Sequence, residues 1–360
     1  MQRDFPISTD TITAEWLNEA LRECGHLLAG EVAFVEAEPI GEGAGMVARV
    51  ARLHLAQSTG ERIGCMIAKF PTAVVGNRAV AATFQVYERE VGFYRSLAPS
   101  ISTAPHCYFA NIDPSGDFLL LMEDGSALRP GDQVIGASLR DAELAVDAAA
   151  ELHAAFWSSD ARPEADWVIS VNGDVHRPAM SAGVIAGWAG CMRDFGDVVD
   201  PELVGMEERF VRSLPWLHEA MSAGAQTLIH GDFRLDNMMF DDCSADRPIF
   251  LFDWQSILVS KGTHDVAFFL TQNLPVDLAR EEEERLVQRY YERLIARGVK
   301  DYAWDECWQD YRLSSLYVFN VAVLICGTLA RSDERATRFM RELIRRSSAA
   351  TKRVLDLLPS

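Results

Sequence analysis

The sequence predicts an α+β fold with two lobes, a small β-rich lobe followed by a larger helical one. Three observations support this prediction. β-rich runs separated by short turns occupy residues 31–70, amphipathic helical patterns dominate after residue 125, and a length of 360 residues suits two packed lobes. A hydrophobic fraction of 49% is high enough for a large buried core. We expect a division into residues 1–123 and 124–360.

The first lobe begins with a predicted helix at residues 10–24, with Thr13 or Asp10 as its cap. Three β-rich runs follow at residues 31–40, 46–56 and 62–70. The turn-forming stretches GEGAG and QSTGE separate them, which predicts an antiparallel meander. A helix is expected at residues 77–97, with one buried face formed by Val80, Phe84, Tyr87, Val91 and Tyr94. Two more strands are expected at residues 106–113 and 117–124.

Long amphipathic patterns predict the helices of the second lobe, at residues 139–157, 202–223, 280–297, 304–330 and 334–358. Short β-like runs interrupt them at residues 237–240 and 249–254. Residues 313–330 are nearly uncharged and about long enough to span a bilayer. Because Ser314, Ser315, Asn320 and Gly327 dilute this stretch, we interpret it as a buried core helix.

Composition also narrows the class of partner. The net charge of -19 argues against nucleic acid, which proteins hold with an excess of Lys and Arg. The seven cysteines are scattered and show no C-x-x-C spacing, so neither a disulfide framework nor a zinc site is expected. Free thiols and an N-terminus without an apolar signal segment predict a cytoplasmic protein.

The chemistry is concentrated in residues 229–255, where polar residues lie between short apolar runs. The segment reads IHGDFRLDNMMFDDCSADRPIFLFDWQ. Phosphoryl transfer requires a carboxylate to orient a hydroxyl group and accept its proton, together with oxygen ligands for magnesium. Asp232 suits the first role, and Asn237 and Asp253 suit the second. A polar loop whose Asp and Asn residues only cap turns is the structural alternative.

The motif H-G-D-F-R-L-D-N resembles the protein-kinase catalytic loop, H-R-D-x-x-x-x-N. Gly in place of Arg is a feature of the aminoglycoside phosphotransferase and choline kinase families. The chain looks most similar to bacterial phosphotransferases grouped with them and with ecdysteroid kinase-like proteins. This resemblance implies a protein-kinase-like fold whose small lobe has an antiparallel sheet and one helix. It also implies that Asp232 is the catalytic base, that Arg234 contacts the γ-phosphate, and that Asn237 and Asp253 bind magnesium.

The same resemblance assigns roles upstream. It implies that Lys69, at the end of the third strand, holds the ATP phosphates and pairs with Glu90 on the following helix. Helical geometry alone leaves Glu88 as an alternative, and the pattern E-x-x-F-Y favours Glu90. We interpret Gly41, Gly43 and Gly45 as a loop that covers phosphates, because glycine lets backbone N–H groups approach them. Glu123 and Gly125, at the end of the fifth strand, are candidates for contacts to adenine.

Supporting roles are expected for His153 and His230, as buried structural histidines, and for Asp265, as an anchor of the catalytic loop. The predicted function is transfer of phosphate from ATP, with Mg²⁺, to a hydroxyl group of a small molecule. The sequence leaves the acceptor open among aminoglycosides, choline-like alcohols, sugars and steroid-like alcohols. It predicts no nucleic-acid or membrane partner. The alternatives are a metal-dependent phosphohydrolase that uses His264 and Asp265, and a nucleotide-binding pseudokinase.

Overall fold

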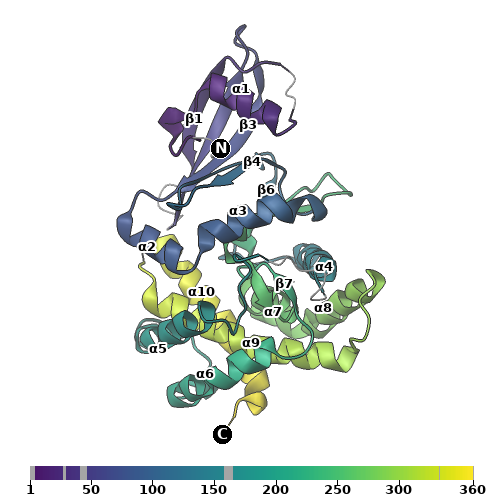
Figure 1. The fold of residues 1–360 in the computed structure, drawn as a ribbon. Helices are drawn as coiled ribbons and strands as arrows, with labels where there is room; N and C mark the ends of the chain where they lie inside the picture. The colour runs from purple at the N-terminus through teal and green to yellow at the C-terminus, as the bar shows by residue number, and fades with distance from the viewer. Residues whose placement is uncertain (1–4, 27–29, 41–46, 158–164, 332, 360) are drawn as a thin grey trace. The chain divides into compact units, whose positions relative to one another are not determined.

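The computed structural model describes residues 5–26, 30–40, 47–157, 165–331 and 333–359. The chain forms two compact units, Met1–Leu128 and Arg129–Ser360. The first unit is built around a β-sheet and the second is mainly helical (Figure 1). The sequence-based boundary after residue 123 marks where we expect the nucleotide-binding lobe to end, and it stays a prediction about function.

Five strands form one antiparallel sheet in the described part of the first unit. Their order is β1-β2-β3-β5-β4. The bounds are Phe34–Ile40 for β1, Ala48–Ala56 for β2, Arg62–Pro71 for β3, Cys107–Ile112 for β4 and Phe118–Glu123 for β5. The predicted meander of the first three strands is confirmed, because β2 pairs antiparallel with both β1 and β3.

The two faces of this sheet differ in chemistry. One face packs against α1 (Ala14–Glu23), which Thr13 caps by accepting a hydrogen bond from the backbone N–H of Trp16. The core on this face contains Leu17, Leu21, Leu53, Leu55, Met66, Ala68 and Phe70. Because side chains alternate along a strand, the intervening residues of β2 and β3 lie on the opposite face. These residues are Arg52, His54, Cys65, Ile67 and Lys69.

The helix expected at residues 77–97 is two helices in the structure, α2 (Val75–Thr83) and α3 (Val86–Ser96). The break occurs at Gln85, whose φ of 53° is left-handed and cannot continue a helix. The prediction of a single buried face was therefore wrong for Val80, which lies on α2 and is half exposed. Tyr87, Val91 and Tyr94 lie on α3 and are buried as expected.

The second unit combines short strands with long helices. β6 (Arg129–Pro130), β8 (Met238–Phe240) and β9 (Ile249–Leu251) form one sheet, and β7 (Thr227–Ile229) pairs with β10 (Leu258–Ser260). The helices are α4 (Leu139–Ala155), α5 (His176–Phe195), α6 (Glu207–Ser222), α7 (Thr263–Asn273), α8 (Val276–Ala296), α9 (Trp304–Thr328) and α10 (Glu334–Thr351). Helices α5 and α7 were not predicted.

The core of the second unit lies among α5, α6, α9 and α10, where Trp188, Phe210 and Phe319 contact one another. Helix α9 is long and apolar enough to span a membrane by length and composition, but most of its apolar stretch is buried against other helices. Such burial is typical of the core helix of a globular protein. The interpretation of residues 313–330 as a core helix is therefore confirmed up to Thr328, where α9 ends.

Candidate active site

The first unit holds a buried ion pair on the face of the sheet opposite α1. Lys69 of β3 places its Nζ 2.7 Å from Oε1 of Glu90 on α3. Lys69 is 7% exposed and Glu90 is 1% exposed. A buried lysine needs such a partner, because an isolated charge inside a protein is costly. Glu90, rather than Glu88, is therefore the partner of Lys69, and the contact of Lys69 with nucleotide phosphates stays a prediction.

The predicted catalytic loop connects β7 to β8 and is anchored by Asp265 of α7. Oδ2 of Asp265 accepts the backbone N–H of His230 at 2.7 Å, and Oδ1 accepts that of Gly231 at 3.0 Å. Gly231 has a φ of 80°, and a Cβ there would collide with the backbone oxygen of Ser256. Glycine in the motif H-G-D therefore has a local reason: the loop turns in a left-handed conformation against a neighbouring backbone.

Two histidines and a tyrosine surround the Asp265 anchor. Nε2 of His153 lies 3.2 Å from Oδ2 of Asp265, and Nδ1 of His153 lies 2.8 Å from the hydroxyl of Tyr290. Burial by itself raises the pKa of the Asp265 carboxyl. The hydrogen bond with His153 and the nearby His264 lower it by more, so the net pKa lies well below its ordinary value. His264 and Asp265 are both buried, and both oxygens of Asp265 already accept N–H groups of the loop. This disfavours a phosphohydrolase site at this pair.

The loop holds the Asp232 carboxylate through one of its two oxygens. Oδ2 accepts a hydrogen bond from Nε of Arg234 at 3.1 Å and another from Nδ2 of Asn237 at 2.8 Å. Nδ2 of Asn237 also donates to the backbone oxygen of Asp232, at 2.9 Å. These bonds hold the Asp232 carboxylate through Oδ2, and they use the amide nitrogen of Asn237, whose carbonyl Oδ1 is its only atom able to bind a metal ion. Both roles stay predictions.

Asp253 lies two residues after the end of β9, and Phe252 between them lies opposite Asn237. The backbone N–H of Phe252, its neighbour, donates to the backbone oxygen of Asn237 at 2.9 Å. Asp253 has a φ of 64°, a left-handed conformation that is uncommon for residues other than glycine and is concentrated at functional sites. Gln255 donates from Nε2 to Oδ2 of Asp253 at 3.1 Å. Asn237 and Asp253 thus offer the hard oxygen donors that suit Mg²⁺.

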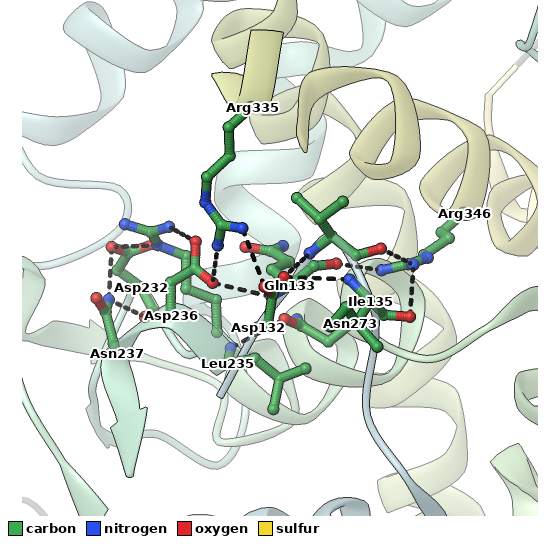
Figure 2. Close-up of polar contacts among 12 residues, drawn as sticks. Asp132, Gln133, Ile135, Asp232, Leu235, Asp236, Asn237, Asn273, Arg335 and Arg346 are labelled. Atoms are coloured by element: carbon green, nitrogen blue, oxygen red, sulfur yellow. Dashed lines mark hydrogen bonds and ion pairs between the residues drawn. The ribbon is translucent and has the colours of Figure 1, made fainter. Parts of the chain in front are cut away.

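A polar network that sequence reasoning missed connects this loop to α10 (Figure 2). Oδ1 of Asp236 accepts the backbone N–H of Gln133 at 2.8 Å, and Oδ1 of Asn273 accepts that of Leu235 at 2.9 Å. Arg346 of α10 is 4% exposed. Its guanidinium donates to the backbone oxygens of Gln133, Val134, Ile135 and Gln272, at 2.6–3.5 Å.

Two other residues on the same face of α10 contact the loop directly. Arg335 lies 2.9 Å from Asp132 and 3.8 Å from Asp236, and Arg234 lies over the ring of Phe339. Residues 335, 339 and 346 recur at helical spacing. Arg346 could have been identified from the sequence, because it is a charged residue on the apolar face of an amphipathic helical pattern.

The remaining predicted residues are only partly described. Gly41, Gly43 and Gly45 lie outside the described residues. The backbone N–H of Glu123 donates to the backbone oxygen of His106, and its carboxylate accepts the N–H of the same residue. The backbone oxygen of Gly125 accepts the N–H of Leu128. Adenine contacts at Glu123 and Gly125 stay predictions.

Solved structures with a similar fold are kinases and phosphotransferases that act on small molecules. Choline kinase from Cryptosporidium parvum Iowa II has a TM-score of 0.55 and 11% identity, covering 96% of this chain and 98% of that one. A microcompartment-associated aminopropanol kinase has a TM-score of 0.53 and 14% identity, covering 95% and 99%. A macrolide 2'-phosphotransferase from Brachybacterium faecium has a TM-score of 0.46 and 17% identity, covering 89% and 99%. The likeness to choline kinase and to the aminopropanol kinase shows the fold alone, which is protein-kinase-like.

A comparison with curated proteins found no significant match to this sequence. The ecdysteroid kinase-like family, in contrast, matches residues 42–300. This match covers most of the chain and includes Lys69, Glu90, the loop from His230 to Asn237, Asp253 and Asp265. The chain therefore belongs to the ecdysteroid kinase-like family.

Proposed function

We propose that this protein is an ATP- and Mg²⁺-dependent kinase that transfers the γ-phosphoryl group to a hydroxyl group of a small molecule. The observation that carries the proposal is the geometry of Asp232. Its Oδ2 is held by Arg234 and Asn237, and this supports a role for the other carboxylate oxygen as the one that meets the acceptor hydroxyl. Membership of a kinase-like family supports the same reaction class.

Each of the four site residues in the second unit has a distinct role in the proposed reaction. Oδ1 of Asp232 orients the acceptor hydroxyl and takes its proton as the oxygen attacks the γ-phosphorus. Arg234 holds the Asp232 carboxylate and places positive charge beside the transferred group. Asn237 and Asp253 would hold Mg²⁺, which neutralises phosphate charge when bound.

In the first unit, Lys69 is the proposed ligand of the α- and β-phosphates, and Glu90 fixes its position. The ion pair at 2.7 Å supports this role because it holds the ammonium group in one place inside the protein. Gly41, Gly43 and Gly45 are proposed to cover the phosphates, and Glu123 and Gly125 to contact adenine. The proposed location is the cytoplasm.

Phosphoryl transfer is tested by incubating the protein with MgATP and a panel of alcohols, from aminoglycosides and amino alcohols to sugars and sterols. The panel is followed by ADP release and by mass analysis of the acceptor. Asp232→Asn should lower kcat on the order of 10²–10⁴-fold while MgATP still raises the melting temperature, because the substitution removes the base and keeps the fold. Asp246→Asn, an exposed change in the hairpin after β8, is the matched control.

The outcome also separates the kinase from a pseudokinase. A pseudokinase would be stabilised by MgATP, release no ADP with any acceptor, and show no difference between wild type and Asp232→Asn. Full turnover by Asp232→Asn would contradict the proposed role of Asp232 as the catalytic base.

A further inference from the structure

Three neighbouring strands of the first unit place a thiol, an imidazole and a carboxylate in a row. Sγ of Cys65 on β3 lies 3.3 Å from Nδ1 of His54 on β2, and Nε2 of His54 lies 2.9 Å from Oε2 of Glu38 on β1. His54 and Cys65 are directly paired across the two strands. The row faces away from the α1 core, and Cys65 is partly exposed.

The bonds fix the direction in which a proton moves along this row. A carboxylate only accepts hydrogen bonds, so Nε2 of His54 carries the hydrogen that Glu38 accepts. Nδ1 of His54 is then the acceptor for the thiol proton of Cys65. The hydrogen bond from His54 lowers the pKa of Glu38, which keeps the carboxylate charged beside the imidazole. This arrangement gives the Cys65 thiol an adjacent proton acceptor, as a general base does beside a nucleophilic cysteine.

The other cysteines have different surroundings. Desolvation raises the pKa of Cys107, which is partly exposed, to about 12 and that of the buried Cys307 to about 12. Cys191 and Cys326 are buried like Cys307. Cys24 and Cys243 are exposed and therefore report the reactivity of accessible thiols in the same chain.

Cys65 also lies on the face of the sheet that carries Lys69. Both residues belong to β3 and are four positions apart, about 13 Å along a strand. Met66, beside Cys65, is paired with Glu123 on β5. Cys65 therefore lies toward the end of the strand where we expect adenine, and Lys69 lies where we expect phosphate. Arg52 donates to Glu38 and to Asp124, and it thereby connects the row to the residue that follows β5.

We propose that Cys65, with His54 and Glu38, is a modification site for small disulfides and other soft electrophiles, and that its modification blocks nucleotide binding. In the disulfide reaction the thiolate attacks one sulfur, a new S–S bond to Cys65 forms, and the old S–S bond breaks. The thiolate that leaves takes the proton from the His54 imidazolium. The second half of the proposal, the effect on nucleotide, rests on the proposed kinase function.

The first experiment measures the reactivity of the thiols without reference to any activity. The native protein is treated with limiting iodoacetamide, and the rate at each cysteine is followed by peptide mass analysis. Cys65 should react at least tenfold faster than Cys24 and Cys243. His54→Gln should reduce the rate at Cys65 to that of the two reference thiols and leave their rates unchanged, and Glu38→Gln should give an intermediate rate.

Equal rates at Cys65 and the reference thiols, or no effect of His54→Gln, would overturn the proposal. Circular dichroism and melting temperature check that each variant is folded. The reference thiols within each sample provide a second check, because a loosened fold would raise their rates as well.

The second experiment measures the rise in melting temperature caused by MgATP before and after treatment with glutathione disulfide. Treatment should abolish the rise in wild type and have no effect on the rise in Cys65→Ser. A rise that persists in protein carrying the mixed disulfide would overturn the effect on nucleotide. No rise in untreated protein would instead contradict the kinase function, and the alkylation rates would still decide the reactivity of Cys65.

Discussion

Gly231 illustrates at the scale of one residue why the catalytic loop has its sequence. We expect Gly231→Ala to lower the free energy of unfolding by more than the ~1–2 kcal/mol that a left-handed backbone costs alanine, because its Cβ meets the backbone oxygen of Ser256. Gly205→Ala is the matched control, with a φ of 81° and nothing within 4 Å of the added atom. Chemical denaturation measures both variants, and equal losses would contradict the predicted collision.

The lowered pKa of Asp265 leads us to expect a defined dependence of the free energy of unfolding on pH. Asp265→Asn keeps one acceptor oxygen for the loop, so we expect a loss of roughly 1–3 kcal/mol for each buried N–H left without a partner. The folded-state pKa of Asp265 is lowered, so its contribution is complete above the unfolded pKa of about 3.9. Below that pH the unfolded chain takes up the proton first, and the contribution is lost as pH falls through the folded pKa.

Urea denaturation of wild type and Asp265→Asn between pH 7 and pH 3 tests this sign. The difference in unfolding free energy should stay constant down to about pH 4 and shrink below it. Asp246→Asn again provides the exposed control. A difference that grows as the solution becomes more acidic would contradict a lowered pKa for Asp265.

At the scale of one element, α10 supports the proposed catalytic loop. Arg346 fixes the backbone of residues 133–135, and the N–H of Gln133 fixes Asp236 within the loop. We expect Arg346→Met to lower kcat on the order of tenfold to a hundredfold, because small misplacements of a catalytic group have effects of that size. The KM for ATP should change little. Arg345→Met, which removes a partly exposed arginine paired with Glu342, is the control.

Lysine at position 346 distinguishes positioning from simple stability. Arg346→Lys keeps the charge but cannot reproduce the planar fork that donates to several carbonyl oxygens. It should therefore recover melting temperature more than kcat. Added guanidinium should raise kcat of Arg346→Ala selectively. Recovery of kcat in strict proportion to stability would leave Arg346 with a structural role only.

Elements with a strong local signal were predictable, and those set by distant contacts were not. The meander, α1 with its Thr13 cap, and the loop from His230 to Asn237 follow from patterns within a few residues. The break at Gln85 was missed because no Gly or Pro marks it. Helix α7 was missed because its residues are almost all buried, so they lack the polar face that reveals a helix.

The candidate site divides in the same way. Asp232 and Asn237 are five residues apart, and their contact is local. Arg346 and Gln133 are 213 residues apart, so only the folded chain brings them together. Helical geometry left the partner of Lys69 open between Glu88 and Glu90, and the pattern E-x-x-F-Y favoured Glu90. The structure places Oε1 of Glu90 2.7 Å from Nζ of Lys69.

For the whole molecule, the net charge of -19 predicts an effect of salt on stability. Excess charge of one sign repels itself in the compact state, and salt screens that repulsion. We expect the melting temperature to rise between 10 mM and 200 mM KCl. A fall would mean that surface ion pairs, such as Arg289 with Asp147, outweigh the repulsion.

The dependence of the loop on Arg346 has a consequence for how the protein is made. Ribosomes synthesise chains from the N-terminus, and the parts of a protein fold in that order. Arg346 is added 109 residues after Asn237. A nascent chain that already contains every proposed catalytic group would still lack the support for its loop. Incomplete translation products that end before Arg346 should therefore show a lower kcat in the proposed kinase assay than the 360-residue chain.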